Sequence, residues 1–121
     1  MSITITPSRL SAFAAALDSV GFSVEAAATA MGSMAEALSF SLERPSAAPL
    51  LADVNLSADA LRARLTADPG RAVLRVLQAA NTAAARRYAV LAGLFGASLL
   101  SSAERLAAAV DLAGTATMRP A

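Results

Sequence analysis

A run of sixteen residues without a charged side chain is the feature that most constrains how this chain folds. The run extends from Tyr88 to Ala103, and small residues recur in it four apart, as at Gly93 and Ala97. A helix over this run is apolar on nearly every face. It therefore needs a bilayer, a partner protein or the chain's own core to cover it. At 1.5 Å per residue the run spans roughly 24 Å, less than a hydrocarbon core of about 30 Å. The length favours packing against protein over spanning a membrane.

The spacing of apolar residues predicts two long helices. Thr6 and Pro7 form a helix start, and apolar residues then recur at gaps of three and four from Leu10 to Leu38. Proline ends this helix, and a second helix opens at Asp68. We therefore expect a helix over residues 7–43, a linker over 44–56, a short helix over 57–67 capped by Ser57, a helix over 69–113 stopped by Gly114, and a frayed tail over 114–121.

Two long helices joined by a turn segment bury their apolar faces by lying antiparallel. The predicted fold is all-α, a single domain over residues 1–121. Its shape is an elongated antiparallel helical hairpin with a short extra helix near the turn. Because 33 of the 121 residues are alanine, the core is expected to be thin and to be completed by a partner.

The second helix is apolar on more than one side, which predicts a second protein surface against it. Val90, Leu94 and Leu100 lie away from the row that faces the first helix, and Gly93 and Gly96 would allow another helix backbone to approach closely. The predicted partner interface comprises Leu10, Phe13, Leu17, Val24, Tyr88, Val90, Leu91, Gly93, Leu94, Phe95, Gly96, Leu99 and Leu100.

The composition leaves few groups for catalysis. The chain has no histidine and no cysteine, which removes the commonest general base, the commonest metal ligand and thiol chemistry. A carboxylate metal site would need Asp18, Glu25 or Glu36 to face Glu104 or Asp111 across the hairpin; solvated helix faces are the simpler interpretation. No glycine-rich phosphate loop is present. We predict a non-enzymatic protein without catalytic residues, metal, cofactor or small-molecule substrate.

Arginine is the only basic residue type, and six arginines fall between residues 62 and 87. Arg71, Arg75 and Arg86 follow helical spacing along one face. They are candidates for contact with an acidic partner or an anionic lipid surface, and an ordinary solvated face is the alternative. With a net charge of +1 and no aromatic residues among the arginines, nucleic acid is not an expected partner.

The opening "ITITPSRLSAFAAALDSV" and the segment "RRYAVLAGLFGASLLSSAERLAAAVDLAG" resemble the small helical-hairpin substrates of type VII (ESX-like) secretion systems. The resemblance implies a hairpin that dimerises, with a similar chain or with itself, into a four-helix bundle. It also implies a protein that is cytoplasmic before export and then secreted or held at the cell surface without a cleavable signal peptide.

Three motifs of that family are replaced in this chain. There is no tryptophan for a Trp-x-Gly turn, Pro7 is followed by Ser8 instead of glutamate, and Tyr88 is followed four residues later by Ala92 instead of an acidic residue. The resemblance therefore implies that any export signal lies on the partner chain.

Two other hypotheses remain open at the level of sequence. One is a membrane-associated helical protein that inserts residues 88–103, with Arg86 and Arg87 at the headgroups. The other is a homo-oligomeric adaptor module unrelated to secretion.

Overall fold

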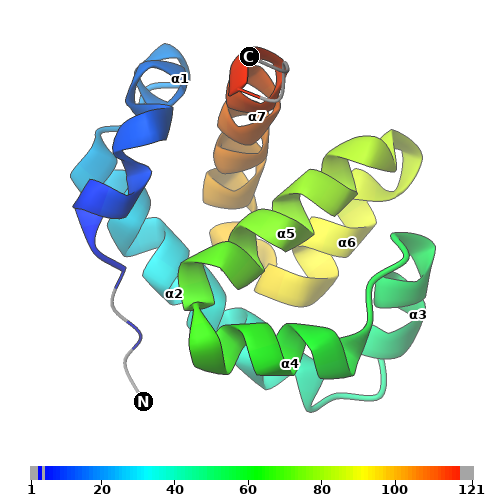
Figure 1. Ribbon diagram of the computed structural model, residues 1–121. Helices are drawn as coiled ribbons and strands as arrows, with labels where there is room; N and C mark the ends of the chain where they lie inside the picture. The colour runs from blue at the N-terminus through cyan, green and yellow to red at the C-terminus, as the bar shows by residue number, and fades with distance from the viewer. Residues whose placement is uncertain (1–2, 4, 118–121) are drawn as a thin grey trace.

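The computed structural model describes residue 3 and residues 5–117, and every regular element in this part of the chain is helical (Figure 1). The all-α prediction is thereby confirmed. The α-helices are α1 (Ala14–Ser19), α2 (Val24–Leu42), α3 (Ala47–Asp53), α4 (Ala58–Ala67), α5 (Pro69–Thr82), α6 (Arg87–Phe95) and α7 (Leu100–Thr117), and the 3₁₀ helices are η1 (Pro7–Phe13), η2 (Ala84–Arg86) and η3 (Ala97–Leu99).

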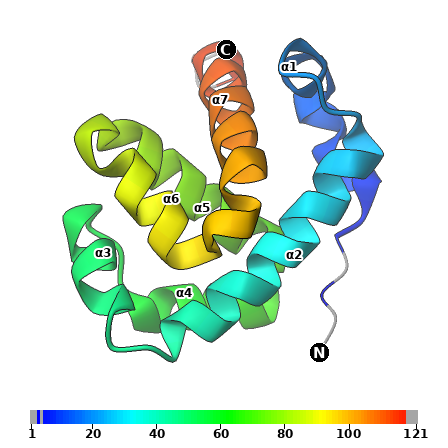
Figure 2. The same cartoon turned by 180° about the vertical axis from the view of Figure 1, so that it is seen from behind.

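The helices α2 and α5 lie at the centre of the fold, as the two opposite views show (Figures 1 and 2). Helix α2 packs against η1, α4, α5 and α6, and helix α5 packs against α4, α6 and α7. At the periphery, α3 packs against α6 and α1 packs against α7. Side chains from all seven α-helices join one hydrophobic cluster, so short helices enclose a common core.

The prediction of one helix over residues 7–43 is wrong, because the chain breaks at Gly21. Phe22 N–H donates to Leu17 O at 2.9 Å and Gly21 N–H donates to Asp18 O at 3.1 Å, the two bonds of a Schellman motif. Gly21 has φ +82°, which glycine adopts without a steric penalty. Ser23 then caps α2 by accepting from Ala26 N–H. The segments before and after this break are bent by 105°.

The prediction of one helix over residues 69–113 is also wrong, because the chain breaks twice. Helix α5 ends at Thr82, whose hydroxyl donates to Ala79 O at 2.8 Å, so a side chain competes with the backbone for that carbonyl. Helix α6 ends before Gly96, which has φ +87° and ψ 159°, a conformation essentially restricted to glycine. The second break bends the chain by 114°. The two long helices that an elongated hairpin requires are therefore not formed within residues 5–117.

The predicted linker over residues 44–56 contains a helix, α3. Pro49 lies in the first turn of α3, where its missing N–H would have no partner within the helix, so proline is tolerated there. Asn55 follows α3 with φ +58°, and bonds from Asn55 N–H to Ala52 O and from Leu56 N–H to Leu51 O form a second Schellman motif. Pro49 is therefore compatible with a helix, and the prediction of a linker is wrong for the residues of α3.

The predictions at the start of the short helix and of α5 are confirmed. Ser57 caps α4 by accepting from Ala60 N–H, and Asp68 caps α5 by accepting from Arg71 N–H. The start predicted at Thr6 and Pro7 is also confirmed, since Thr6 is the N-cap residue of η1 and Pro7 its first residue, although Thr6 makes no side-chain capping bond. The stop predicted at Gly114 is wrong, because α7 continues to Thr117. Of the predicted tail, residues 114–117 are helical, and residues 118–121 lie outside the described part of the chain.

Three side chains bridge separate helices by hydrogen bonding to backbone carbonyls. Ser41 Oγ of α2 donates to Leu94 O of α6 at 2.6 Å, and Arg62 Nη2 of α4 donates to Leu42 O at the end of α2 at 2.8 Å. Asn81 Nδ2 of α5 donates to Ala107 O of α7 at 2.8 Å. The first two bonds satisfy carbonyls that a helix end leaves without a partner.

Small residues bring the elements close together. Alanines on α2, α5 and α7 are fully buried, so the backbones of these helices approach their neighbours with few side-chain atoms between them. Near the N-terminus, the backbone passes Gly32 of α2 so closely that a Cβ there would lie 2.6 Å from Ile3 O. The thin core expected from the alanine content is not found, because most of the buried residues are larger than alanine. The largest fully buried side chains are Met31, Met34, Leu38, Leu51, Leu77, Leu91, Leu94 and Leu106.

The bond between α2 and α6 gives a test of the bent arrangement. We expect Ser41→Ala to lower the free energy of unfolding by about 1–3 kcal/mol, because Leu94 O loses its partner in a partly buried site. Urea unfolding followed by circular dichroism measures this change. The matched control is Ser39→Ala at an exposed position of the same helix, which should be close to neutral. Equal effects of the two substitutions would contradict the contact.

Candidate functional site

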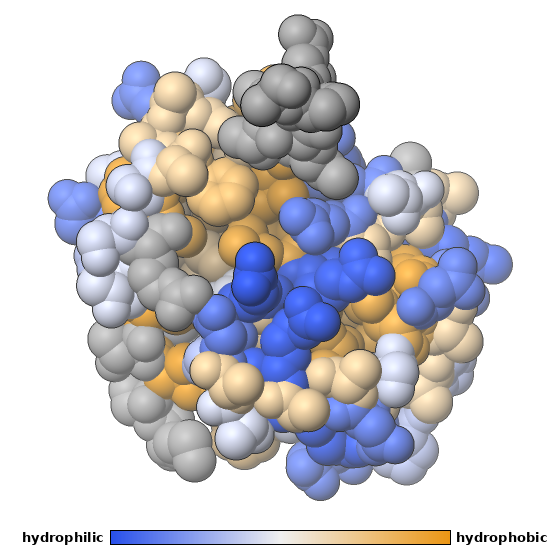
Figure 3. Space-filling view, viewed as in Figure 1, coloured by the Kyte–Doolittle hydropathy of each residue, from blue (hydrophilic) through white to orange (hydrophobic). Residues whose placement is uncertain are grey.

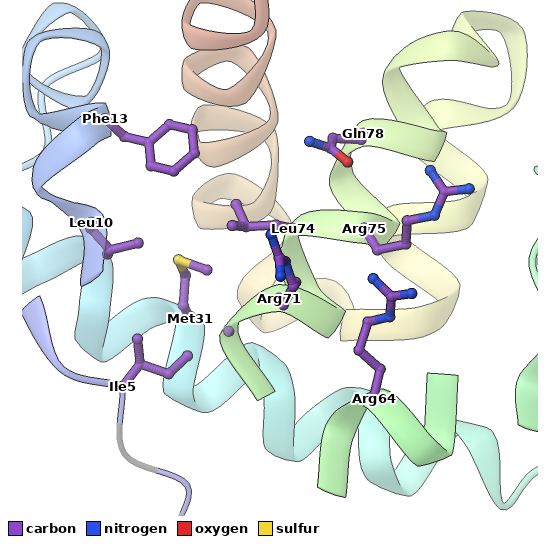
Figure 4. Close-up of a pocket in the computed structure, with 10 residues that line it drawn as sticks. Ile5, Leu10, Phe13, Met31, Arg64, Arg71, Leu74, Arg75 and Gln78 are labelled. Carbon is purple, nitrogen blue, oxygen red and sulfur yellow. The ribbon is translucent and has the colours of Figure 1, made fainter. Parts of the chain in front are cut away.

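A pocket of about 390 Å³ opens between η1 and α5 and is the strongest candidate for a ligand site (Figure 4). One side of it is apolar and the other is polar. On the face shown in Figure 3, hydrophobic and hydrophilic surfaces adjoin each other. The apolar side is formed by Ile5, Leu10, Phe13, Met31 and Leu74, and the polar side by Arg64, Arg71, Arg75 and Gln78.

Helix periodicity aligns most of the polar side. Arg71, Arg75 and Gln78 are spaced four and three residues apart on α5, so they share one face of the helix. Arg64 joins them from α4, which packs against α5. All three arginines are exposed, and none makes an ion pair within the described residues. Three exposed arginines therefore border an apolar hollow, and Asp68 at the start of α5 lies beside them, where it accepts from Arg71 N–H.

The structure divides the three arginines that sequence spacing had grouped. Arg71 and Arg75 line the pocket, whereas Arg86 lies beyond the end of α5, where its Nε is 3.9 Å from Asp53 Oδ2. Arg64 was not among the candidates, because its place beside α5 depends on the turn between α4 and α5. The sequence does contain one signal for the position of Arg64. The helix start at Asp68 and Pro69 limits the turn between α4 and α5 to very few residues, so the two helices must lie close together.

The residues of the predicted partner interface mostly face the chain's own core. Tyr88 is an exception, with 65% of its surface exposed. Gly93 is also exposed, and Gly96 is intermediate. Phe13, Val24, Leu99 and Leu100 are partly buried, and Leu10, Leu17, Val90, Leu91, Leu94 and Phe95 are buried.

The argument that another chain must cover the far side of the second helix is wrong for this compact arrangement. Val90 and Leu94 are fully buried, because α6 is short and is surrounded by α2, α3, α5 and α7. The inference assumed a straight helix of about 45 residues with one neighbour. A chain bent at Gly96 supplies several neighbours of its own.

The close approach predicted at the small-residue row does occur, and its partner is α3. A Cβ at position 93 would overlap the side chain of Leu50, so Gly93 is the residue that lets α3 lie against α6. Gly96 has a different role: a Cβ there would meet no atom within 4 Å, and its positive φ ends the helix. The two glycines therefore serve packing and chain reversal respectively.

Acidic side chains do not converge within the described residues. No group of three carboxylates that could hold a metal ion is formed there, so Asp18, Glu25 and Glu36 do not meet Glu104 and Asp111 as a metal site would require. Arg105, next to Glu104, lies over the ring of Phe22 at 5.8 Å from its centroid. That contact joins α7 to the chain just after the Gly21 bend.

The uncharged run from Tyr88 to Ala103 is distributed over α6, η3 and the start of α7. In the described residues no single helix has the length and apolar character to cross a membrane. Two bent pairs of helices have that length and apolar character only when the two segments of a pair are counted together. These pairs are Leu10–Ser19 with Val24–Leu42, and Arg87–Phe95 with Ala97–Ala113.

No protein-family model, curated protein or solved structure matches this chain.

The contact between Gly93 and Leu50 gives a second test of the fold. We expect Gly93→Ala to lose much or all of the roughly 1 kcal/mol of unfolding free energy that alanine gains over glycine within a helix, because the end of the Leu50 side chain must move away from the added methyl group. In a Leu50→Ala background the same substitution should retain that gain, since the overlapping atoms are gone. A double-mutant cycle from urea unfolding measures the difference. Additive effects would show that α3 does not lie against α6.

Proposed function

We propose that this chain is a non-enzymatic, type VII secretion-associated protein that acts by helix-bundle association with a similar hairpin chain or with a second copy of itself. The basis in sequence is the resemblance of its opening and of its alanine-rich second half to small helical-hairpin substrates. In this proposal the compact arrangement is the unassociated form of the chain. The associated form is an antiparallel hairpin within a four-helix bundle.

The observation that carries the proposal is that both large bends rest on glycines with positive φ, Gly21 and Gly96. If both bends straighten, the segments from Leu10 to Leu42 and from Arg87 to Ala113 become helices about 50 Å and 40 Å long at 1.5 Å per residue. These are the paired lengths that a hairpin bundle needs.

Straightening would also redirect side chains that the compact form buries. In α2, the buried residues Ala27, Met31, Met34 and Leu38 keep the three-and-four spacing of a bundle seam. In the compact form they contact the chain's own helices; in the associated form they would contact a partner. A partner favours the open form only if it binds that form more tightly than the closed one, and this exposed seam supplies the difference.

Substitution of the two bend glycines tests the conformational part of the proposal. A Cβ at either position meets no atom within 4 Å, so alanine acts there through the backbone alone. Alanine in a positive-φ conformation costs about 1–3 kcal/mol, and in a continuous helix it is about 1 kcal/mol better than glycine. We expect Gly21→Ala/Gly96→Ala to raise helix content and to increase association at micromolar concentration.

Small-angle X-ray scattering and light scattering measure the outcome. A compact chain of this length has a radius of gyration of about 14 Å. A hairpin about 50 Å long has one of only about 15–16 Å, so the mass measured by light scattering is the deciding readout. The control is Gly70→Ala, since Gly70 lies in the first turn of α5, where an added Cβ makes only ordinary contacts. A double variant that stays a folded, compact monomer would overturn the association mechanism.

Export is tested separately in the natural host. We expect the chain in the culture filtrate of cells with an intact type VII secretion ATPase, and its retention in cells that lack this ATPase. A cytoplasmic enzyme measured in the same filtrates controls for lysis. Equal retention in both strains would remove the secretion role and leave a homo-oligomeric adaptor as the alternative.

Membrane insertion through residues 88–103 is the competing function, and the bent pair Arg87–Phe95 with Ala97–Ala113 favours it by length and composition. Carbonate extraction distinguishes the two functions. A chain that stays with the membrane after extraction is inserted, and the bundle proposal then fails.

A further inference from the structure

The pocket between η1 and α5 combines an apolar side with three arginines, and this combination limits what it can bind. The guanidinium groups of Arg64, Arg71 and Arg75 lie along one side of the pocket, and Phe13 and Met31 lie on the other (Figure 4). A purely apolar ligand would leave the cations without a partner. Phe13 and Leu74 are the apolar lining residues that are only partly buried, and a small inorganic anion would leave both of them uncovered. The pocket matches a molecule that carries both an alkyl chain and a negative charge.

We propose that this pocket binds a fatty acid anion, with its carboxylate at Arg71 and Arg75 and its alkyl chain against Phe13 and Leu74. The proposal does not rest on the secretion-associated function. The sequence indicates an anionic lipid surface as one candidate contact and predicts no small-molecule substrate. The present proposal instead assigns a ligand with one alkyl chain to the pocket between η1 and α5.

The size of the hollow favours a small molecule over a protein surface. Its volume of about 390 Å³ falls within the range of small-molecule sites, roughly 300–1,000 Å³. A stable protein–protein contact instead buries about 1,200 Å² or more of total surface. A single alkyl chain with one charged end fills such a hollow without requiring a broad complementary face.

The charges favour a carboxylate at this place. Arginine presents planar N–H donors that bind a carboxylate in a two-pronged geometry. The three arginines repel one another, and a bound anion would offset that repulsion. Arg71 also lies in the first turn of α5, where the helix dipole disfavours a cation, so its position has a local cost that an anionic ligand would reduce.

Titration calorimetry with dodecanoate, below the concentration at which it forms micelles, tests the proposal. We expect saturable one-to-one binding, at least tenfold tighter than that of dodecanol, which lacks the charge, and of acetate, which lacks the chain. Equal binding of dodecanoate and dodecanol would show that the arginines play no part. Absence of dodecanoate binding would overturn the proposal.

Variants locate the ligand. We expect Arg71→Gln/Arg75→Gln to weaken dodecanoate binding at least tenfold without loss of helix content, since both side chains are exposed. The matched control is Arg87→Gln, an exposed arginine at the start of α6 that does not line the pocket. If the double variant binds as the native chain does, or if Arg87→Gln weakens binding equally, the ligand lies elsewhere and the proposal fails.

Two further measurements separate this site from a lipid-surface contact. In NMR spectra, dodecanoate should shift the methyl signals of Met31, Leu10 and Leu74 more than that of Leu112, which lies on α7 and is half exposed. Vesicles containing phosphatidylglycerol are the second probe. Binding to these vesicles without binding of monomeric dodecanoate would overturn the proposal in favour of a membrane-surface role.

Discussion

The positive φ angles of Gly21 and Gly96 determine where the helices of this chain can lie. Each glycine follows a helix and reverses the chain without a steric penalty, by 105° at the first bend and 114° at the second. Because the chain turns at Gly21, η1 packs against α2 and α1 against α7, and because it turns at Gly96, α7 returns along α5. The pocket beside η1 depends on the first reversal, and the α7 contact that helps to cover α6 depends on the second.

Much of the local structure could be predicted from sequence, because it depends on neighbouring residues. Ser57 and Asp68 cap the helices that they were expected to cap, and the apolar spacing within α2 marks the residues that are buried. The break at Gly21 also carried a local signal. A glycine followed two residues later by serine is a helix stop followed by a helix start. The signal was missed because the three-and-four spacing continues from Leu17 to Val24 across the bend, so both flanking segments still face the core.

The arrangement of the helices and most of the candidate site could not be predicted in this way. Ser41 and Leu94 are 53 residues apart, and nothing in their own neighbourhoods indicates that they meet. The pocket likewise has one part that the sequence predicts and one part that depends on the fold. The spacing of Arg71 and Arg75 was visible on one helix, whereas Arg64 joins them only because α4 folds back on α5. The exclusion of helix from residues 44–56 failed for a different reason, since proline in a first turn does not oppose a helix.

The hydrogen bonds that cross between helices make the ends of those helices depend on one another. Leu42 O at the end of α2 is satisfied from α4, and Leu94 O near the end of α6 is satisfied from α2. Asn81 also joins α5 to α7, but its acceptor, Ala107 O, lies within α7 and not at its end. Fraying of one helix would thus leave an unpaired carbonyl on another. We therefore expect the C-terminal ends of α2 and α6 and the helix α4 to open together in amide hydrogen exchange, as one local unit within the fold.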